Sequence, residues 1–167
     1  MKDALTHEIE LYSLDSFQIL LDHEIHRSRR YKNPLTLIHL AIETDPDRPE
    51  IQYSAETFAI NILDVQLRNT DIPCRKGNEF LVLMPATDEA GGRVVCERLA
   101  KLFNVPQQTY DRVSFKMTIF VGMASLPGSS SLTSNNLMQQ ASKAVQYARD
   151  NHIINAVTYS EINERNT

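Results

Sequence analysis

Long apolar stretches are missing from this chain of 167 residues. No run approaches the roughly 20 apolar residues that a membrane-spanning helix needs, and the opening stretch MKDALTHEIELYSLD has no apolar signal-peptide core. With 42% apolar and 23% charged residues, the composition is that of one globular domain. We therefore expect a soluble protein of the cytoplasm, alone or as a piece of a larger cytoplasmic protein.

Basic charge is also in short supply. The 17 lysines and arginines are outnumbered by 21 acidic residues, which gives a net charge of −4. A surface that binds DNA or RNA needs a basic face, so this balance argues against a nucleic-acid partner. A small anionic ligand is compatible with the composition, because two or three local arginines are enough to bind it.

Cysteine and histidine offer little for a metal or a cofactor. The two cysteines, Cys74 and Cys96, form neither a CxxC pair nor a disulfide framework, and we expect both to be reduced core residues. His23 and His26 are three residues apart on a predicted helix, but no third ligand accompanies them. We expect His39 within or beside a buried strand, and we expect neither a metal site nor a cofactor.

Helical and strand patterns alternate along the chain. Apolar residues at helical spacing predict helices over residues 14–31, 54–69, 88–103 and 137–152, and apolar runs of strand length predict strands over 35–43, 72–75, 79–84, 115–126 and 155–160. Loops are expected at 44–50 (TDPDRPE) and 127–136, and a tight turn at Lys76-Gly77-Asn78. This order, with one central hairpin, predicts an α/β (α+β) fold in which helices pack against a mixed sheet.

Four stretches, taken in order, resemble the GGDEF domain of the diguanylate cyclase family over nearly the whole chain. The family's first helix and strand are matched by HEIHRSRRYKNPLTLIHL, and the strand and turn after its signature are matched by EFLVLMPATDEA. A later strand is matched by MTIFVGMAS, and the last long helix is matched by ASKAVQYARDNHIINAV. The resemblance implies a ferredoxin-like palm over residues 14–160, with an N-terminal segment 1–13 and a C-terminal tail 161–167. In active members two such domains meet, each with one GTP, and metal-assisted phosphoryl transfer yields cyclic di-GMP.

The acids that hold the metal in that family are replaced here. The family's Asp-x-Asp on the first strand corresponds to Ala41-Ile42-Glu43, and a methyl group cannot ligate magnesium. At the third signature position, normally an acid, stands Asn78, whose neutral amide is a poorer ligand. We therefore expect no cyclase activity and a vestigial active site formed by Ala41, Glu43, Lys76, Gly77, Asn78, Glu79 and Arg149.

The signature turn also departs from the family's Arg-x-Gly-Gly-Asp-Glu-Phe. This chain reads RKGNEF, one residue shorter, so Lys76 either replaces the first glycine or precedes a deletion. Glu79 and Phe80 survive, and we interpret Phe80 as a core residue and Glu79 as a cap of the turn. On the last long helix Arg149 takes the place of the family lysine, while the partner arginine falls on Ile153.

A second family feature is retained. Many GGDEF domains carry an inhibitory site for the product, an Arg-x-x-Asp just before the signature supported by an arginine on the following helix. Arg68, Asp71 and Arg98 stand in that register. The resemblance thus implies a cyclic di-GMP site. In such a site the arginine guanidinium groups donate hydrogen bonds to phosphate oxygens or to a guanine edge, and the aspartate accepts hydrogen bonds from the guanine N1–H and amino group.

Each of these three residues also has a purely structural interpretation. Arg68 suits the negative end of a helix, Asp71 can cap the turn that follows, and Arg98 can pair with a nearby carboxylate. The first hypothesis is nevertheless a catalytically inactive GGDEF domain that acts as a receptor for cyclic di-GMP. The alternative is a nucleotide-independent interaction or dimerisation scaffold, and a weaker third is a regulatory GTP site in which Lys76 and Arg149 meet the phosphates without magnesium.

Overall fold

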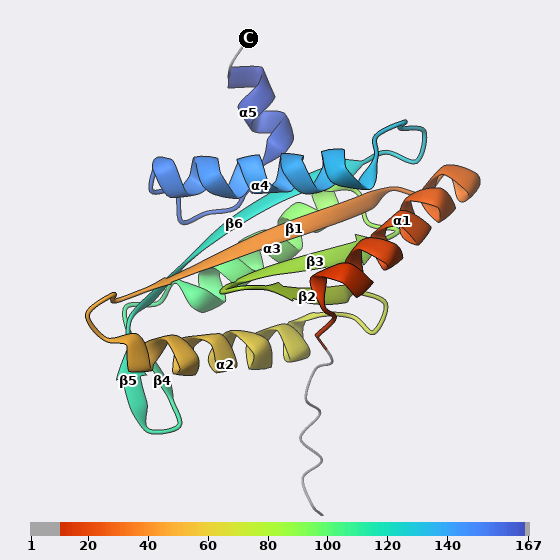
Figure 1. Cartoon of the computed structure of the whole chain (residues 1–167). Helices are drawn as coiled ribbons and strands as arrows, with labels where there is room; N and C mark the ends of the chain where they lie inside the picture. The colour runs from red at the N-terminus through yellow and green to blue at the C-terminus, as the bar shows by residue number, and fades with distance from the viewer. Residues whose placement is uncertain (1–10, 166–167) are drawn as a thin grey trace, which may run out of the picture.

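The computed structural model describes residues 11–165 and contains one central mixed sheet with helices on both faces (Figure 1). The helices are α1 (Leu14–Tyr31), α2 (Pro49–Gln66), α3 (Glu89–Phe103), α4 (Ser134–Asp150) and α5 (Tyr159–Arg165). The strands are β1 (Leu35–Thr44), β2 (Ile72–Lys76), β3 (Glu79–Pro85), β4 (Gln108–Tyr110), β5 (Val113–Phe115), β6 (Met117–Leu126) and β7 (Val157–Thr158). The predicted fold class is confirmed.

The sheet has the strand order β2-β3-β1-β6-β7. β1 lies at its centre, antiparallel to both β3 and β6, and β7 pairs parallel to β6. The almost unbroken apolar run of β1 is explained by burial on both faces, because successive side chains point to opposite sides of a strand. Ile38 and Leu40 join the core beneath α2 and α3, while Leu35 and Leu37 join the core beneath α1 and α4.

Helix α4 lies unusually close to the sheet at Gly122 of β6. A Cβ at this position would lie 2.2 Å from the backbone nitrogen of Val145 and 2.8 Å from the carbonyl oxygen of Ala141. Only glycine permits this approach, since backbone atoms on α4 cannot move aside as a flexible side chain does. The close contact fixes the height of α4 and therefore the position of Arg149 near its end.

Several predicted boundaries are wrong. Helix α2 already begins at Pro49, inside the loop predicted at 44–50, because proline is well tolerated in the first turn of a helix. It ends at Gln66 rather than at residue 69. Helix α4 begins at Ser134 inside the predicted loop 127–136, where Thr133 and Asn136 form a capping box.

Two further elements were missed. The β4–β5 hairpin turns at Asp111 and Arg112, both with positive φ, and it packs Tyr110 and Phe115 edge-on against Phe58 of α2. The strand predicted over 155–160 is only the two-residue β7, and the chain then forms α5, which covers most of the expected tail 161–167. In Figure 1, α5 follows β7 and projects past α4.

The edge strand β2 receives a residue from the segment predicted to precede the domain. Tyr12 forms a parallel bridge with Cys74: the Tyr12 N–H donates to the Pro73 carbonyl oxygen at 3.1 Å, and the Arg75 N–H donates to the Tyr12 carbonyl oxygen at 3.3 Å. Both Cys74 and Cys96 are free and buried, as predicted. Among residues 11–165, no helix is long and apolar enough to cross a membrane.

Candidate ligand-binding site

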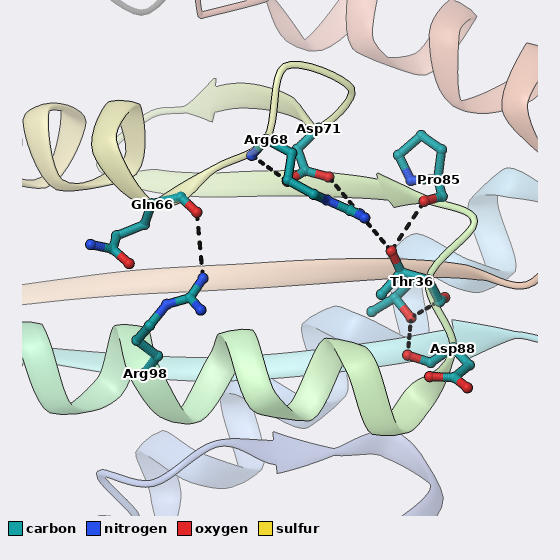
Figure 2. A network of polar contacts seen from close by, with 8 residues as sticks. Thr36, Gln66, Arg68, Asp71, Pro85, Asp88 and Arg98 are labelled. Carbon is teal, nitrogen blue, oxygen red and sulfur yellow. Dashed lines mark hydrogen bonds and ion pairs between the residues drawn. The ribbon is translucent and has the colours of Figure 1, made fainter.

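A pocket of about 450 Å³ lies between the end of α2, the loop from β3 to α3, and the first turns of α3 (Figure 2). Its polar lining comprises Gln66, Arg68, Asp71, Thr87, Asp88 and Arg98. All three residues predicted to bind a ligand, Arg68, Asp71 and Arg98, therefore line one pocket, although they come from two separate segments of the chain. Its volume falls within the range of small-molecule sites.

The turn that follows α2 brings Arg68 and Asp71 together. The Asp71 N–H donates to the Arg68 carbonyl oxygen at 3.0 Å, and the Arg68 N–H donates to Asp71 Oδ2 at 2.8 Å, which closes the turn from both sides. The guanidinium of Arg68 also donates to this carboxylate, from Nη2 to Oδ1 at 3.1 Å and from Nε to Oδ2 at 3.4 Å. The Asp71 side chain is only 1% exposed, whereas that of Arg68 is 54% exposed.

This geometry differs from the predicted cap. The Asp71 carboxylate closes the turn that precedes it, not the turn that follows. It also faces Arg68 on both oxygens, so in this structure it accepts hydrogen bonds from within the chain. A direct contact between Asp71 and a ligand stays a prediction.

Thr87 completes the surroundings of Arg68, and sequence reasoning missed it. Its Oγ1 accepts from Arg68 Nη2 at 2.7 Å and donates to the Pro85 carbonyl oxygen at 3.0 Å. Its backbone carbonyl oxygen accepts from Thr36 Oγ1 of β1 at 2.9 Å, so the loop is anchored to the centre of the sheet. The available sequence signal was weak: a threonine before the helix cap Asp88 is typical of any strand-to-helix loop.

Arg98 reaches the pocket from α3. Its Nη2 donates to the Gln66 carbonyl oxygen at 3.4 Å, a long bond that closes one end of the pocket (Figure 2). Contrary to the structural alternative, no ion pair of the described residues involves Arg98. Its guanidinium therefore retains donors for an acceptor in the pocket, and phosphate or carboxylate oxygens fit such donors best.

A separate polar cluster lies on the opposite face of the sheet, where the vestigial active site was expected. Arg149 of α4 donates from Nη2 to Glu79 Oε1 at 3.0 Å, and its Nε lies 3.3 Å from Glu43 Oε1. The other oxygen of Glu79 lies 3.0 Å from Nε2 of His39. The guanidinium is thus an internal counter-ion for two carboxylates from two strands.

Both titratable partners at the centre of this cluster have shifted pKa values. Burial lowers the pKa of His39 and outweighs the opposing hydrogen bond and charge of Glu79. Partial burial alone would raise the pKa of Glu79, but the hydrogen bonds and charges of His39 and Arg149 together hold it below its usual value. We assign a neutral His39 at pH 7, whose Nε2–H donates to an ionised Glu79. Its buried Nδ1 has no partner among the described residues.

The signature hairpin is shorter than predicted. Lys76 pairs with Glu79 in the sheet, so the turn consists of Gly77 and Asn78 alone, and Gly77 has the positive φ of 63° that favours glycine. Phe80 is fully buried, as predicted. The interpretation of Glu79 as a cap of the turn is wrong, because its carboxylate points to His39 and Arg149 instead.

The residues of this cluster do not fit a magnesium site. Ala41 is fully buried and packs against Ala144, Val145 and Ala148 of α4, so it offers only a methyl group. The two remaining carboxylates already share the Arg149 guanidinium. In the part of the chain that the structure describes, no three side chains of His, Cys, Asp or Glu form a group that could hold a metal ion.

The family model of the GGDEF domain, described as "Diguanylate cyclase, GGDEF domain", matches residues 57–153, more than half of the chain. The protein therefore belongs to the GGDEF domain family. A comparison with curated protein sequences gives no match.

Solved GGDEF domains share the fold. The GGDEF domain of DgcB from Caulobacter crescentus, in complex with c-di-GMP, has a TM-score of 0.78 at 13% identity and covers 89% of each chain. The FimX GGDEF domain from Pseudomonas aeruginosa has a TM-score of 0.77 at 16% identity, over 89% of this chain and 94% of the other. The diguanylate cyclase SiaD from the same organism, in complex with its activator SiaC, has a TM-score of 0.74 at 19% identity. The match covers 89% of this chain and 58% of the SiaD chain.

Proposed function

We propose that this GGDEF domain is a receptor for cyclic di-GMP that has no diguanylate cyclase activity and works in the cytoplasm as a signalling module. One observation carries the proposal: Arg68, Asp71 and Arg98, separated by up to 30 positions in the sequence, line a single pocket. The c-di-GMP complex of the DgcB domain, which has the same fold, supports the choice of ligand.

The pocket suits an anion with a planar base. Arg68 and Arg98 supply two positive charges and retain unbonded N–H groups, which match phosphate oxygens. The side chains of Met84 and Val95 add apolar surface against which a base can lie. Each charged hydrogen bond to the ligand is worth about 1.5–3 kcal/mol, so the loss of one arginine weakens binding at least about tenfold.

The lack of catalysis is proposed from the second cluster. Metal-assisted phosphoryl transfer requires carboxylates that are free to hold the cation against the phosphates. Here Glu43 and Glu79 share Arg149, and Ala41 has no ligand atom. The same contacts argue against the regulatory GTP site, since an Arg149 held between two carboxylates is a poor partner for a third anion.

The test is isothermal titration of cyclic di-GMP into the wild type and into Arg98→Ala. Arg98 is exposed and makes one long hydrogen bond, so we expect its replacement to leave the fold intact. Arg112→Ala, in the β4–β5 turn and remote from the pocket, is the matched control. Micromolar or tighter binding that Arg98→Ala weakens at least about tenfold, and Arg112→Ala leaves unchanged, supports the receptor.

Two outcomes would overturn this function. If no heat is released and the melting temperature is unchanged by the ligand, the nucleotide-independent scaffold becomes the better hypothesis. If GTP binds in its place and Arg98→Ala has no effect on that binding, the ligand occupies another part of the molecule.

A further inference from the structure

The Arg68 guanidinium is held on two of its three nitrogens. Nε and Nη2 both donate to the Asp71 carboxylate, and Nη2 also donates to Thr87 Oγ1. Nη2 carries two hydrogens, and these two bonds use both of them. Of the five N–H groups, those of Nη1 alone have no partner among the described residues.

Thr87 can hold Arg68 because Thr87 is itself held. Its side chain and backbone lie in a buried position, 8% exposed. The hydroxyl hydrogen is committed to the Pro85 carbonyl oxygen, so Oγ1 faces Arg68 as an acceptor. The backbone carbonyl is bonded to Thr36, a fully buried residue of the central strand. The acceptor that Arg68 meets therefore belongs to a loop residue that is itself anchored to the central strand.

We propose that Thr87 is a positioning residue of the ligand site: together with Asp71 it fixes the Arg68 guanidinium so that Nη1 is left to donate to an anionic ligand in the pocket that Arg98 also lines. This inference rests on the proposed binding of cyclic di-GMP and adds a division of roles to it. Arg98 and the Nη1 edge of Arg68 contact the phosphate, whereas Thr87 acts through Arg68.

The hydroxyl group of Thr87 matters because it helps to order the Arg68 side chain before a ligand binds. A half-exposed arginine side chain is otherwise free in its rotamers, and a ligand that binds it must also offset the entropy of fixing it. With Asp71 and Thr87 as partners, that ordering has already occurred before the ligand arrives. Removing the hydroxyl therefore weakens binding even though the hydroxyl makes no contact with the ligand.

The test is a double-mutant cycle measured by titration with cyclic di-GMP, using Thr87→Val, Arg68→Ala and the double variant. Valine has the shape of threonine without the hydroxyl. We expect Thr87→Val to weaken binding about threefold to tenfold in the wild-type background and to have no further effect when Arg68 is already alanine. Thr87→Ser, which keeps the hydroxyl, is expected to bind like the wild type. Equal effects of Thr87→Val in both backgrounds would overturn the proposal, because they would show a general structural role.

A second measurement needs no ligand and separates this inference from the proposed function. Rotation of the Arg68 guanidinium about its Nε–Cζ bond can be followed by NMR of the side-chain nitrogens. We expect slow rotation in the wild type and in Thr87→Ser, and fast rotation in Thr87→Val. If the wild type binds no cyclic di-GMP, the receptor function fails. Unchanged rotation in Thr87→Val would then overturn the positioning role as well, while faster rotation would retain it for whatever anion the pocket takes.

Discussion

The guanidinium of Arg149 lies 3.0 Å from the carboxylate of Glu79, joining the last long helix to the strand that follows the signature turn. The two side chains are 28% and 21% exposed, so solvent screens this pair less than a surface ion pair. Glu43 and His39 extend the contact on either side. The cluster is therefore a structural link between α4 and the sheet at the place where the vestigial active site was expected.

Replacing Arg149 with methionine is expected to destabilise the fold. Methionine keeps the apolar stem but leaves Glu43 and Glu79 without their counter-ion. We expect the free energy of unfolding at pH 7 to fall by about 1–3 kcal/mol. Urea unfolding measures this, and Arg149→Lys should recover part of the loss. An unchanged unfolding midpoint in Arg149→Met would contradict the structural role.

Stability is expected to fall with acidification in two stages. The pKa of His39 is lowered in the folded state, so protons bind preferentially to the unfolded chain and stability declines as the pH drops below the unfolded value of 6.5. The pKa of Glu79 is also lowered. Glu79 therefore contributes to folding stability at pH values above its unfolded-state pKa of 4.5, and this contribution is lost as the pH falls through the pKa of the folded state.

His39→Gln tests the first stage. Glutamine can still donate to Glu79 but does not titrate, so the decline of the urea midpoint between pH 7 and 5 should become shallower. The exposed His23 provides the control, because His23→Gln should keep the wild-type slope. Identical slopes in all three proteins would show that His39 does not titrate differently in the two states.

Diguanylate cyclase activity is expected to be absent. Incubation with GTP and either Mg²⁺ or Mn²⁺ should give no cyclic di-GMP by chromatography, because the two carboxylates on this face lie within ion-pair distance of Arg149 and Ala41 has no ligand atom. Product that accumulates with time, and disappears in Glu79→Gln, would refute this prediction.

Gly122→Ala is expected to destabilise the fold strongly. The added methyl group would meet backbone atoms of α4, and overpacking of this kind costs about 1–3 kcal/mol or prevents folding. Gly91→Ala is the comparison: its Cβ would lie 3.2 Å from Asp88 Oδ1 and 3.3 Å from Thr87 Cγ2, which are side-chain atoms that can shift, so we expect a smaller loss than in Gly122→Ala. Thermal unfolding compares the two, and equal melting temperatures would disprove the tight contact.

Much of the architecture was predictable because its signals are local. Helix α1 begins and ends where the pattern of Phe17, Leu21 and Ile25 predicts, and β1 is the buried central strand that its apolar run indicates. Short elements such as β4, β5 and α5 carry too few residues for a periodic signal, and they form because tertiary contacts, for example of Tyr110 with Phe58, stabilise them.

The sites divide in the same way. The resemblance to the GGDEF family implied that Arg68, Asp71 and Arg98 form one site, and the structure places them around one pocket. The side-chain hydrogen-bond partners of these residues could not be predicted from the sequence. Nothing local shows that Arg149 meets Glu79 across 70 positions, or that Thr87 accepts a hydrogen bond from Arg68.

The bridge between Tyr12 and Cys74 has a consequence for solubility. Exposed strand edges invite other chains to add to a sheet, and this is a common start of aggregation. Here Tyr12 bonds to the Pro73 carbonyl and the Arg75 N–H on one edge, and the strand at the opposite edge, β7, is only two residues long. Loss of the segment that carries Tyr12 would therefore uncover β2 and favour association between copies through their edges.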